Sequence, residues 1–148
     1  MPNHSILAIT SKIVAICENN VIKKEDNIDK DKIAETEADC YLPRGQSKYG
    51  YMLTIKNGIL LPAAGIDESN GNGYFILWPE NPQRSANQIL NYLRKRFKNQ
   101  TIGVVITDSK TTPLRWGTTG VAIAYSGFSP LKDYIGKPDI FGISMKVT

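Results

Sequence analysis

The sequence predicts a fold in which β-strands form a mixed sheet and helices pack against it. Residues 101–106 form a short, uncharged run rich in β-branched side chains, which is typical of a strand buried on both faces. Residues 51–61 predict a hairpin around Asn57-Gly58, a pair that suits a tight turn with positive φ. Residues 82–98 repeat apolar side chains at steps of three and four, which indicates a helix with one face on the sheet.

The N-terminal half predicts one strand and two helices before this hairpin. Residues 5–10 predict a strand, and a short helix or turn follows to Cys17. A second helix, capped by Asp29 or Asp31, is expected to continue to Leu42. The side chains expected in the core of the first strand are Ile6, Leu7 and Ile9.

The C-terminal half predicts three more strands. Residues 74–78 form an apolar strand, and Asn81 is expected to cap the helix over residues 82–98. Residues 121–125 predict a further buried strand, and residues 143–148 predict a last strand after an irregular stretch. Because the chain begins and ends on strands, we expect a fragment or a reduced version of a larger protein.

Composition limits the function classes. At 148 residues and 41% hydrophobic, the sequence predicts a single domain over residues 1–148. The net charge of +4 is a mild bias that suits acidic small molecules, and the basic end of the helix complements its dipole, so we expect no nucleic-acid partner. No membrane span or signal pattern is visible, which predicts a cytoplasmic protein without membrane contact.

The histidine and cysteine content restricts the possible metal chemistry. His4 is the only histidine, which argues against a histidine-centred triad or a histidine-rich zinc site. Cys17 and Cys40 lack metal-ligand spacing and predict reduced, half-buried thiols, with a disulfide left open. Any metal should therefore be a hard cation bound by oxygen ligands.

The first strand ends in two hydroxyl groups and an ammonium group, Thr10-Ser11-Lys12. In one interpretation Ser11 is a helix N-cap and Lys12 is a solvated residue of the first turn. In the other, Ser11 and Lys12 bind a phosphate at the start of the helix. The sequence leaves both interpretations open and favours the cap, because caps are far more common than phosphate sites.

Two stretches carry carboxylates where apolar sequence ends. Asp108 and Ser109 end the run that starts at residue 101, and a hydroxyl-rich loop with Arg115 follows, as expected for a loop that faces an anion. Residues 63–73 combine small residues with acids, a hydroxyl and amides, and include Asp67 and Asn70. Either stretch alone could be a solvated turn, and the second lacks the EF-hand spacing.

Together these stretches resemble the coenzyme F-420 γ-glutamyl ligase family, including its bacterial folate-metabolism γ-glutamate ligase branch. The resemblance covers nearly the whole chain and rests on several motifs in the same order: Ile9-Thr10-Ser11-Lys12-Ile13-Val14, Ala64-Gly65-Ile66-Asp67-Glu68-Ser69-Asn70, Gly103-Val104-Val105-Ile106-Thr107-Asp108-Ser109, Leu131-Lys132-Asp133-Tyr134 and Asp139-Ile140-Phe141-Gly142. It implies an α+β, two-lobed fold that forms an intertwined homodimer.

The resemblance also implies a ligase chemistry. Family members use GTP and Mg²⁺ or Mn²⁺ to activate a carboxylate as an acyl phosphate, which the amine of L-glutamate attacks. Asp67 and Asp108 match metal ligands, and Ser109 stands where a hydroxyl residue completes the shell of a second metal. Asn70 and Ser11 match nucleotide-contacting positions. From the residue chemistry we add Lys12 as a third nucleotide contact and Arg115 as a catalytic fork for phosphate or carboxylate.

Two departures from the family leave catalysis by this chain open. A second lysine expected a few residues after Ser11 is replaced by Ile16. Family members also extend at both ends, with a later nucleotide loop and another metal ligand, so a relative that binds metal, nucleotide or a glutamylated ligand without turnover is the alternative. The ligase hypothesis would be contradicted if the acids lay on opposite surfaces or if either was locked into an ion pair with lysine or arginine.

Overall fold

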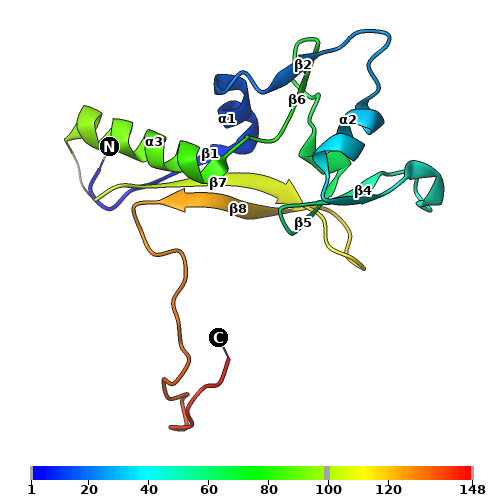
Figure 1. Ribbon diagram of the computed structural model, residues 1–148. Helices are drawn as coiled ribbons and strands as arrows, with labels where there is room; N and C mark the ends of the chain where they lie inside the picture. Colours follow the sequence, from blue (N-terminus) through cyan, green and yellow to red (C-terminus); the bar gives the residue numbers. More distant parts are fainter. Residues whose placement is uncertain (1, 99–100, 148) are drawn as a thin grey trace.

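Strand β7 (Gly103–Lys110) is the centre of the larger sheet in the computed structural model, which describes residues 2–98 and 101–147. β7 pairs in parallel with β1 (Ile6–Thr10) and antiparallel with β8 (Thr119–Ser126), so the sheet is mixed (Figure 1). This confirms the predicted mixed sheet with packed helices and the α+β class.

The central strand is longer than its sequence predicts. The apolar pattern stops at Asp108, yet the strand continues to Lys110 because Asp108, Ser109 and Lys110 pair with the start of β8. The register between β7 and β8 shifts between Ile106 and Thr107, which leaves an unpaired residue in β8. Asp108 is therefore part of a hydrogen-bonded strand and does not begin a loop.

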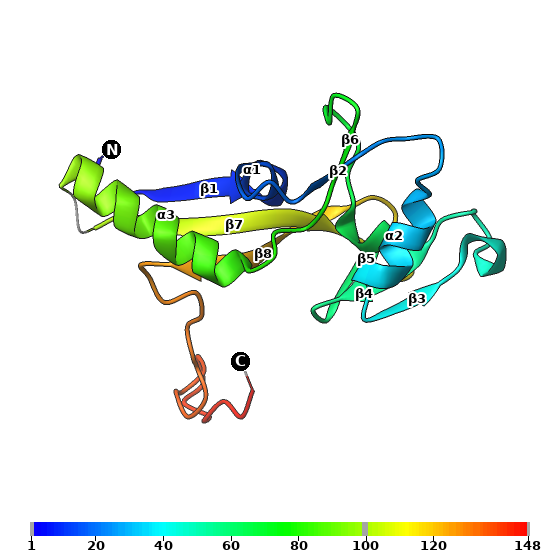
Figure 2. The same ribbon diagram turned by 45° about the horizontal axis from the view of Figure 1, so that its top comes forward.

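Helices α1 (Ser11–Cys17) and α3 (Pro82–Phe97) cover one face of this sheet (Figure 2). Asn81 caps α3 as predicted, and its side chain accepts a hydrogen bond from the Arg84 backbone N–H at 2.9 Å. The helix, strands β7 and β8 and their neighbours bury a first apolar cluster: Val14, Ala86, Leu90, Leu93, Ile102, Val104, Ile106 and Ala124. Ile6 was expected in this core but is 58% exposed, because alternate side chains of β1 face the uncovered side of the sheet.

A smaller sheet of β3 (Cys40–Leu42), β4 (Leu53–Lys56) and β5 (Ile59–Pro62) forms the other end of the molecule. The predicted hairpin is confirmed: Asn57 and Gly58, between β4 and β5, have φ of 50° and 72°. Helix α2 (Lys30–Glu37) starts after Asp29, whose side chain accepts from the Asp31 N–H, and short 3-10 helix η1 (Arg44–Gln46) follows β3.

The prediction that α2 continues to Leu42 is wrong. Ala38 is extended, the Asp39 N–H donates to the Ile55 carbonyl at 2.8 Å, and the next three residues pair with β4 as an edge strand. The apolar residues 40–42 gain strand pairing there, which a local helical pattern does not reveal.

Strands β2 (Val21–Lys23) and β6 (Tyr74–Ile76) form an antiparallel pair beside the 3-10 helix η2 (Ala63–Gly65). β6 is shorter than the predicted 74–78, and an isolated bridge joins its Ile76 to Asp67. A second apolar cluster lies under these elements: Ala34, Met52, Ala63, Ala64, Ile66, Phe75 and Leu77.

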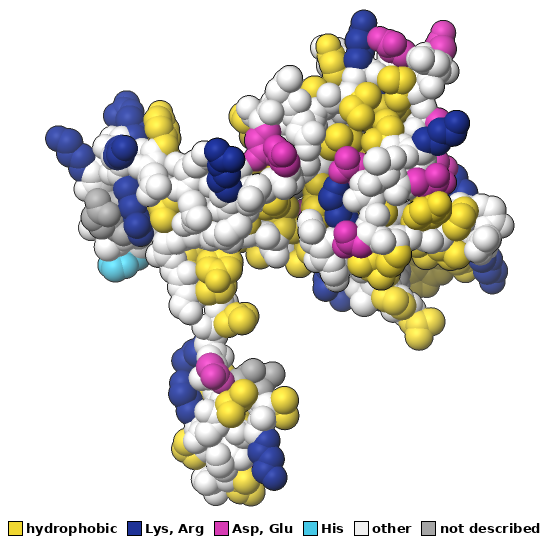
Figure 3. Space-filling model, in the orientation of Figure 1, with side chains coloured by type: hydrophobic (Ala, Val, Ile, Leu, Met, Phe, Trp, Pro, Cys, Tyr) yellow, Lys and Arg dark blue, Asp and Glu magenta, His cyan; other side chains and the backbone are white. Residues whose placement is uncertain are grey.

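The segment after β8 leaves the sheet and projects from the body of the molecule (Figures 1 and 3). The predicted strand over residues 143–148 is wrong for residues 143–147, where one isolated bridge joins Pro138 to Ser144, and Thr148 lies outside the described residues. A single bridge supplies too few hydrogen bonds to hold a strand. Of the helices in residues 2–98 and 101–147, none is both long and apolar enough to cross a lipid bilayer.

Candidate functional site

Three segments that are distant in sequence meet at one cavity of about 250 Å³. Its polar lining comes from the end of β1 and start of α1, from the turn after η2, and from β7: Thr10, Ser11, Lys12, Asp67, Asp108 and Ser109. The parallel register explains part of this arrangement, because Thr10 pairs with Thr107 and the carboxyl ends of β1 and β7 therefore share an edge. The cavity brings together the predicted metal ligands and two of the three predicted nucleotide contacts.

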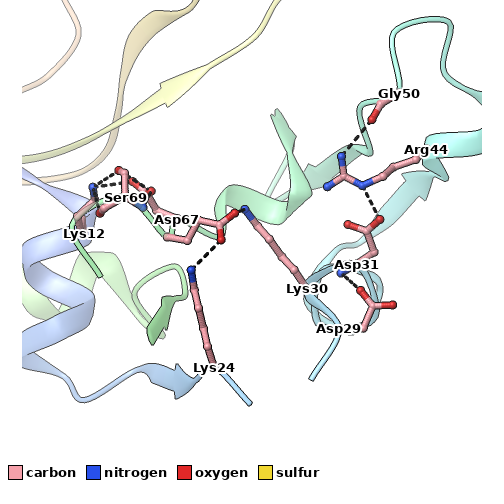
Figure 4. Close-up of polar contacts among 10 residues, drawn as sticks. Lys12, Lys24, Asp29, Lys30, Asp31, Arg44, Gly50, Asp67 and Ser69 are labelled. Atoms are coloured by element: carbon pink, nitrogen blue, oxygen red, sulfur yellow. Dashed lines mark hydrogen bonds and ion pairs between the residues drawn. The ribbon is translucent and has the colours of Figure 1, made fainter. Parts of the chain in front are cut away.

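Asp67 is held by donors on both of its carboxylate oxygens (Figure 4). The Ser69 backbone N–H and hydroxyl donate to Oδ1 at 2.7 and 2.8 Å, and Lys12 Nζ lies 2.7 Å from Oδ2. Partial burial raises the pKa of the Asp67 carboxyl, but the hydrogen bonds from Lys12 and Ser69 outweigh burial and lower this pKa to about 2. Asp67 is therefore a carboxylate throughout the physiological pH range.

The Lys12–Asp67 ion pair is one of the two arrangements that the sequence analysis named as contradicting the ligase hypothesis. The other is excluded, since Asp67 and Asp108 line the same cavity. Lys12 Nζ also donates to the carbonyl and hydroxyl oxygens of Ser69 at 3.0 and 2.9 Å. Metal binding by Asp67 stays a prediction, and any cation there competes with the Lys12 ammonium group.

Asp108 is held by neutral donors. The Ser109 backbone N–H donates to Oδ1 at 2.7 Å, and the indole N–H of Trp78 donates to Oδ2. Trp78 is 2% exposed and lies outside every motif that the sequence analysis selected. Its sequence signal is only its place at the end of an apolar run, which also describes an ordinary core residue.

A cluster of Lys24, Lys30 and Glu68 anchors the turn that carries Asp67. Lys24 and Lys30 donate to the two carboxylate oxygens of Glu68 at 2.8 and 3.1 Å, and they come from two different segments, after β2 and at the start of α2 (Figure 4). The Lys24 and Lys30 ammonium groups lower the pKa of Glu68 below its ordinary value. The sequence analysis selected neither lysine and missed the contact with the turn.

The remaining predicted site residues lie in different places. Ser11 is 5% exposed and is the first residue of α1, and the N-cap position belongs to Thr10, so the cap interpretation of Ser11 is wrong. Asn70 has a left-handed φ of 57° and lines a neighbouring cavity of about 290 Å³, together with Ile16. Arg115 is exposed in the loop between β7 and β8 and is not among the described residues that line the Asp67 cavity.

Neither cysteine lines the Asp67 cavity. Cys17 and Cys40 are both exposed free thiols, so the expectation of half-buried thiols is wrong and the open question of a disulfide is answered. In the part of the chain that the structure describes, no group of three or more histidine, cysteine, aspartate or glutamate side chains is placed to bind a metal. A metal in the cavity would thus have two carboxylates from this chain.

Comparison with known proteins gives the family. The sequence model of the F420-0:gamma-glutamyl ligase family matches residues 1–148. The chain belongs to this family. The coenzyme F420:L-glutamate ligase of Methanosarcina mazei is 32% identical over an alignment that covers 100% of this chain, and that of Methanocaldococcus jannaschii is 30% identical over 92%. The ligase of Methanopyrus kandleri is 41% identical over 64% of this chain.

The match with the F420-0:gamma-glutamyl ligase family confirms the resemblance expected from the motifs. The chain covers only 63% of the length of the M. mazei and M. jannaschii ligases and 37% of the M. kandleri ligase. Ile16, in place of the second lysine expected from the family pattern, is 45% exposed beside Asn70.

Proposed function

We propose that this chain carries part of the catalytic site of a GTP-dependent amide ligase that joins L-glutamate to a carboxylate acceptor. The observation that supports this proposal most directly is the convergence of Asp67, Asp108 and Lys12 on one polar cavity in a member of the F420-0:gamma-glutamyl ligase family. The names of the relatives support glutamate and coenzyme F420 as the substrate classes. We place the reaction in the cytoplasm, in line with the exposed free thiols.

The donor set fits Mg²⁺ or Mn²⁺. These hard cations take oxygen ligands, and Mg²⁺ is commonly bound by one or two carboxylates together with substrate phosphates. In our proposal Asp67 and Asp108 would hold the metal, and Ser109 would complete the shell of a second metal. The positive charge of the metals would neutralise charge on the transferring phosphate. The lowered pKa of Asp67 keeps one of these ligands deprotonated.

The proposed reaction has two steps that balance without another reactant. An oxygen of the acceptor carboxylate takes the terminal phosphoryl group of GTP, and GDP leaves. The amine of L-glutamate then attacks the acyl phosphate, inorganic phosphate leaves, and the amine loses a proton. In our proposal Lys12 and Ser11 contact the phosphates, Asn70 contacts the nucleotide from the neighbouring cavity, and Arg115 binds phosphate or carboxylate from its loop.

We also propose that the chain forms a homodimer through the segment after β8. This segment projects from the body and exposes large apolar side chains, with Leu131, Ile140 and Phe141 83%, 92% and 81% exposed (Figure 3). Such side chains lose contact with water when a second copy covers them. Sedimentation of the whole chain should give a dimer mass, and Phe141→Ser should shift it towards the monomer. An unchanged monomer mass for both chains would contradict the proposal.

Titration calorimetry of the whole chain with GTP and Mn²⁺ tests the site. We expect binding that Asp67→Ala and Asp108→Ala each abolish, whereas Asp26→Ala, at an exposed carboxylate outside the cavity, should bind as the unchanged chain does. Equal binding by all variants would contradict the assigned ligands. Absence of binding by the unchanged chain would contradict a site in this chain.

Phosphate release then separates a ligase from a silent relative. We expect GTP-dependent release of phosphate that requires both L-glutamate and a carboxylate acceptor of the coenzyme F420 type. Binding of GTP and Mn²⁺ without release under these conditions would favour the alternative, a family member that binds these ligands without turnover.

A further inference from the structure

The indole ring of Trp78 lies between the two acidic segments. Its N–H donates to Asp108 Oδ2. The ring also lies close to Gly65, two residues before Asp67: a Cβ added at Gly65 would lie 3.3 Å from Trp78 Cδ1 and 3.4 Å from Trp78 Nε1. The ring therefore packs on the backbone that leads into one acid and forms a hydrogen bond with the other.

The position of the Trp78 ring is itself fixed. Trp78 is 2% exposed, and Asn20 Nδ2 donates to its backbone carbonyl at 2.6 Å. Gly65 adopts φ of 73° and has no side chain, which lets the indole approach closely. The donor for Asp108 thus comes from a buried ring that packing holds in one orientation.

The two hydrogen bonds to Asp108 fix the orientation of its carboxylate and leave room for a cation to bind its oxygens. The indole N–H binds Oδ2 and the Ser109 N–H binds Oδ1, so rotation of the carboxylate would break both hydrogen bonds. A carboxylate has about four lone-pair positions, which leaves acceptor sites on both oxygens. Neither donor is charged, in contrast to Lys12 on Asp67, so the negative charge of Asp108 stays available to a cation.

We propose that Trp78 is a positioning residue that orients Asp108 towards a divalent metal. This inference rests on the proposed function, because Asp108 is a metal ligand only in that proposal. Partners that hold metal ligands in place typically change metal affinity by about 10- to 100-fold when they are removed. Trp78→Phe keeps a buried aromatic ring and removes the N–H, so it tests the hydrogen bond with little loss of volume.

The experiment measures Mn²⁺ affinity in the presence of GTP from the electron paramagnetic resonance signal of free Mn²⁺. The parent is the whole chain with Trp116→Phe, which removes the other tryptophan at a 92% exposed position. We expect Trp78→Phe to weaken Mn²⁺ binding about 10- to 100-fold and Asp108→Asn to abolish it. The matched control is Leu90→Ala, which removes a buried side chain of α3 and should lower the melting temperature without changing Mn²⁺ affinity.

The outcomes distinguish this inference from the proposed function. If the parent binds Mn²⁺, Asp108→Asn does not, and Trp78→Phe binds as the parent does, the role of Trp78 is wrong and the metal site stands. If the parent itself binds no Mn²⁺, the metal site fails and the role of Trp78 fails with it. A loss of affinity in Leu90→Ala equal to that in Trp78→Phe would also overturn the inference, because it would show a general effect of destabilisation.

Nuclear magnetic resonance keeps the test available if Trp78→Phe does not fold. In the Trp116→Phe parent one tryptophan remains, so its indole ¹H–¹⁵N signal belongs to Trp78. Addition of Mg²⁺ with GTP should shift this signal, because the cation changes the electron density of the carboxylate that accepts the hydrogen bond. A signal that stays in place while Mg²⁺ binds would overturn the inference.

Discussion

Replacement of Lys12 by methionine separates the two roles that the site allows for its ammonium group. Lys12 Nζ lies 2.7 Å from Asp67 Oδ2, in the position where a cation bound to Asp67 would compete with it. In the proposed function the same group contacts a phosphate of GTP. Methionine retains a long apolar stem but has no charge and no N–H, so it frees Asp67 and at the same time removes the phosphate contact.

The two effects have opposite signs. The Lys12 and Asp67 side chains are 21% and 40% exposed, and ion pairs this accessible to solvent contribute about 0.2–1 kcal/mol. Release of Asp67 should therefore tighten Mn²⁺ binding without nucleotide by about 1.5- to 5-fold. A hydrogen bond to a charged group contributes about 1.5–3 kcal/mol, so GTP binding at saturating Mn²⁺ should weaken by about 10- to 150-fold.

Calorimetric titrations of Mn²⁺ alone and of GTP at saturating Mn²⁺ measure both effects. Lys95→Met is the matched control, because it removes the same charge from an exposed lysine of α3 that does not line the cavity. We expect that control to change either affinity less than twofold. In our assignment the Lys12 ammonium group pairs with Asp67 when no nucleotide is bound and contacts a phosphate when GTP binds. This assignment would be refuted if Lys12→Met bound Mn²⁺ more weakly without nucleotide, or if it bound GTP as the unchanged chain does.

Three further predictions concern the turn that carries Asp67. Thr54→Val should lower the free energy of unfolding by about 1–3 kcal/mol in a denaturant titration, because the buried Thr54 hydroxyl accepts the Ala64 N–H at 2.7 Å and valine cannot; an unchanged midpoint would contradict this. Gly71→Ala should destabilise by about 1–3 kcal/mol, since its Cβ would lie 2.4 Å from a backbone oxygen, whereas Gly45→Ala meets no described atom within 4 Å and should leave the melting temperature unchanged. Asp67→Asn should cost about 1 kcal/mol at neutral pH, and the difference from the unchanged chain should shrink as the pH falls from about 4 through 2, because the lowered pKa of Asp67 stabilises the folded state only while the carboxylate is charged; a difference as large at pH 2 as at neutral pH would exclude this cause.

Local sequence patterns predicted the elements that are specified by their own residues, such as helix α3 and the hairpin of β4 and β5. The helix α3 has both a cap at Asn81 and an apolar face, and the hairpin has Asn57-Gly58 at the only two positions with positive φ between its strands. Residues 40–42 were assigned to the wrong element because their strand exists only through pairing with β4. A pairing partner that lies ten or more residues away leaves no periodic trace in the strand that it stabilises.

The sequence predicted those residues of the candidate site that are unusual where they stand, namely acids that follow apolar runs. Asp108 and Asp67 interrupt apolar sequence, and the family resemblance predicted that both bind metal in one site. Trp78, Lys24 and Lys30 were missed because a buried tryptophan and a surface lysine are ordinary where they stand. What makes them part of the site is the partner across the cavity, and that partner is set by tertiary packing.

The two candidate ligands are oriented by crossed contacts between the two ends of the molecule. Lys12 follows β1 and Asp108 lies in β7, both in the larger sheet beside the first apolar cluster. Asp67 and Trp78 lie next to β6, beside the second cluster. Each side supplies one carboxylate and the donor that orients the carboxylate of the other side: Lys12 binds Asp67, and Trp78 binds Asp108. Each acid also has a donor from its own side, Ser69 for Asp67 and Ser109 for Asp108, so the contacts across the molecule add to local ones. A change in the packing between the two clusters would remove the contacts across the molecule from both acids together. The distance between Asp67 and Asp108 decides whether they can bind the same cation next to a phosphate. The contacts that join the two ends of the fold also set this distance.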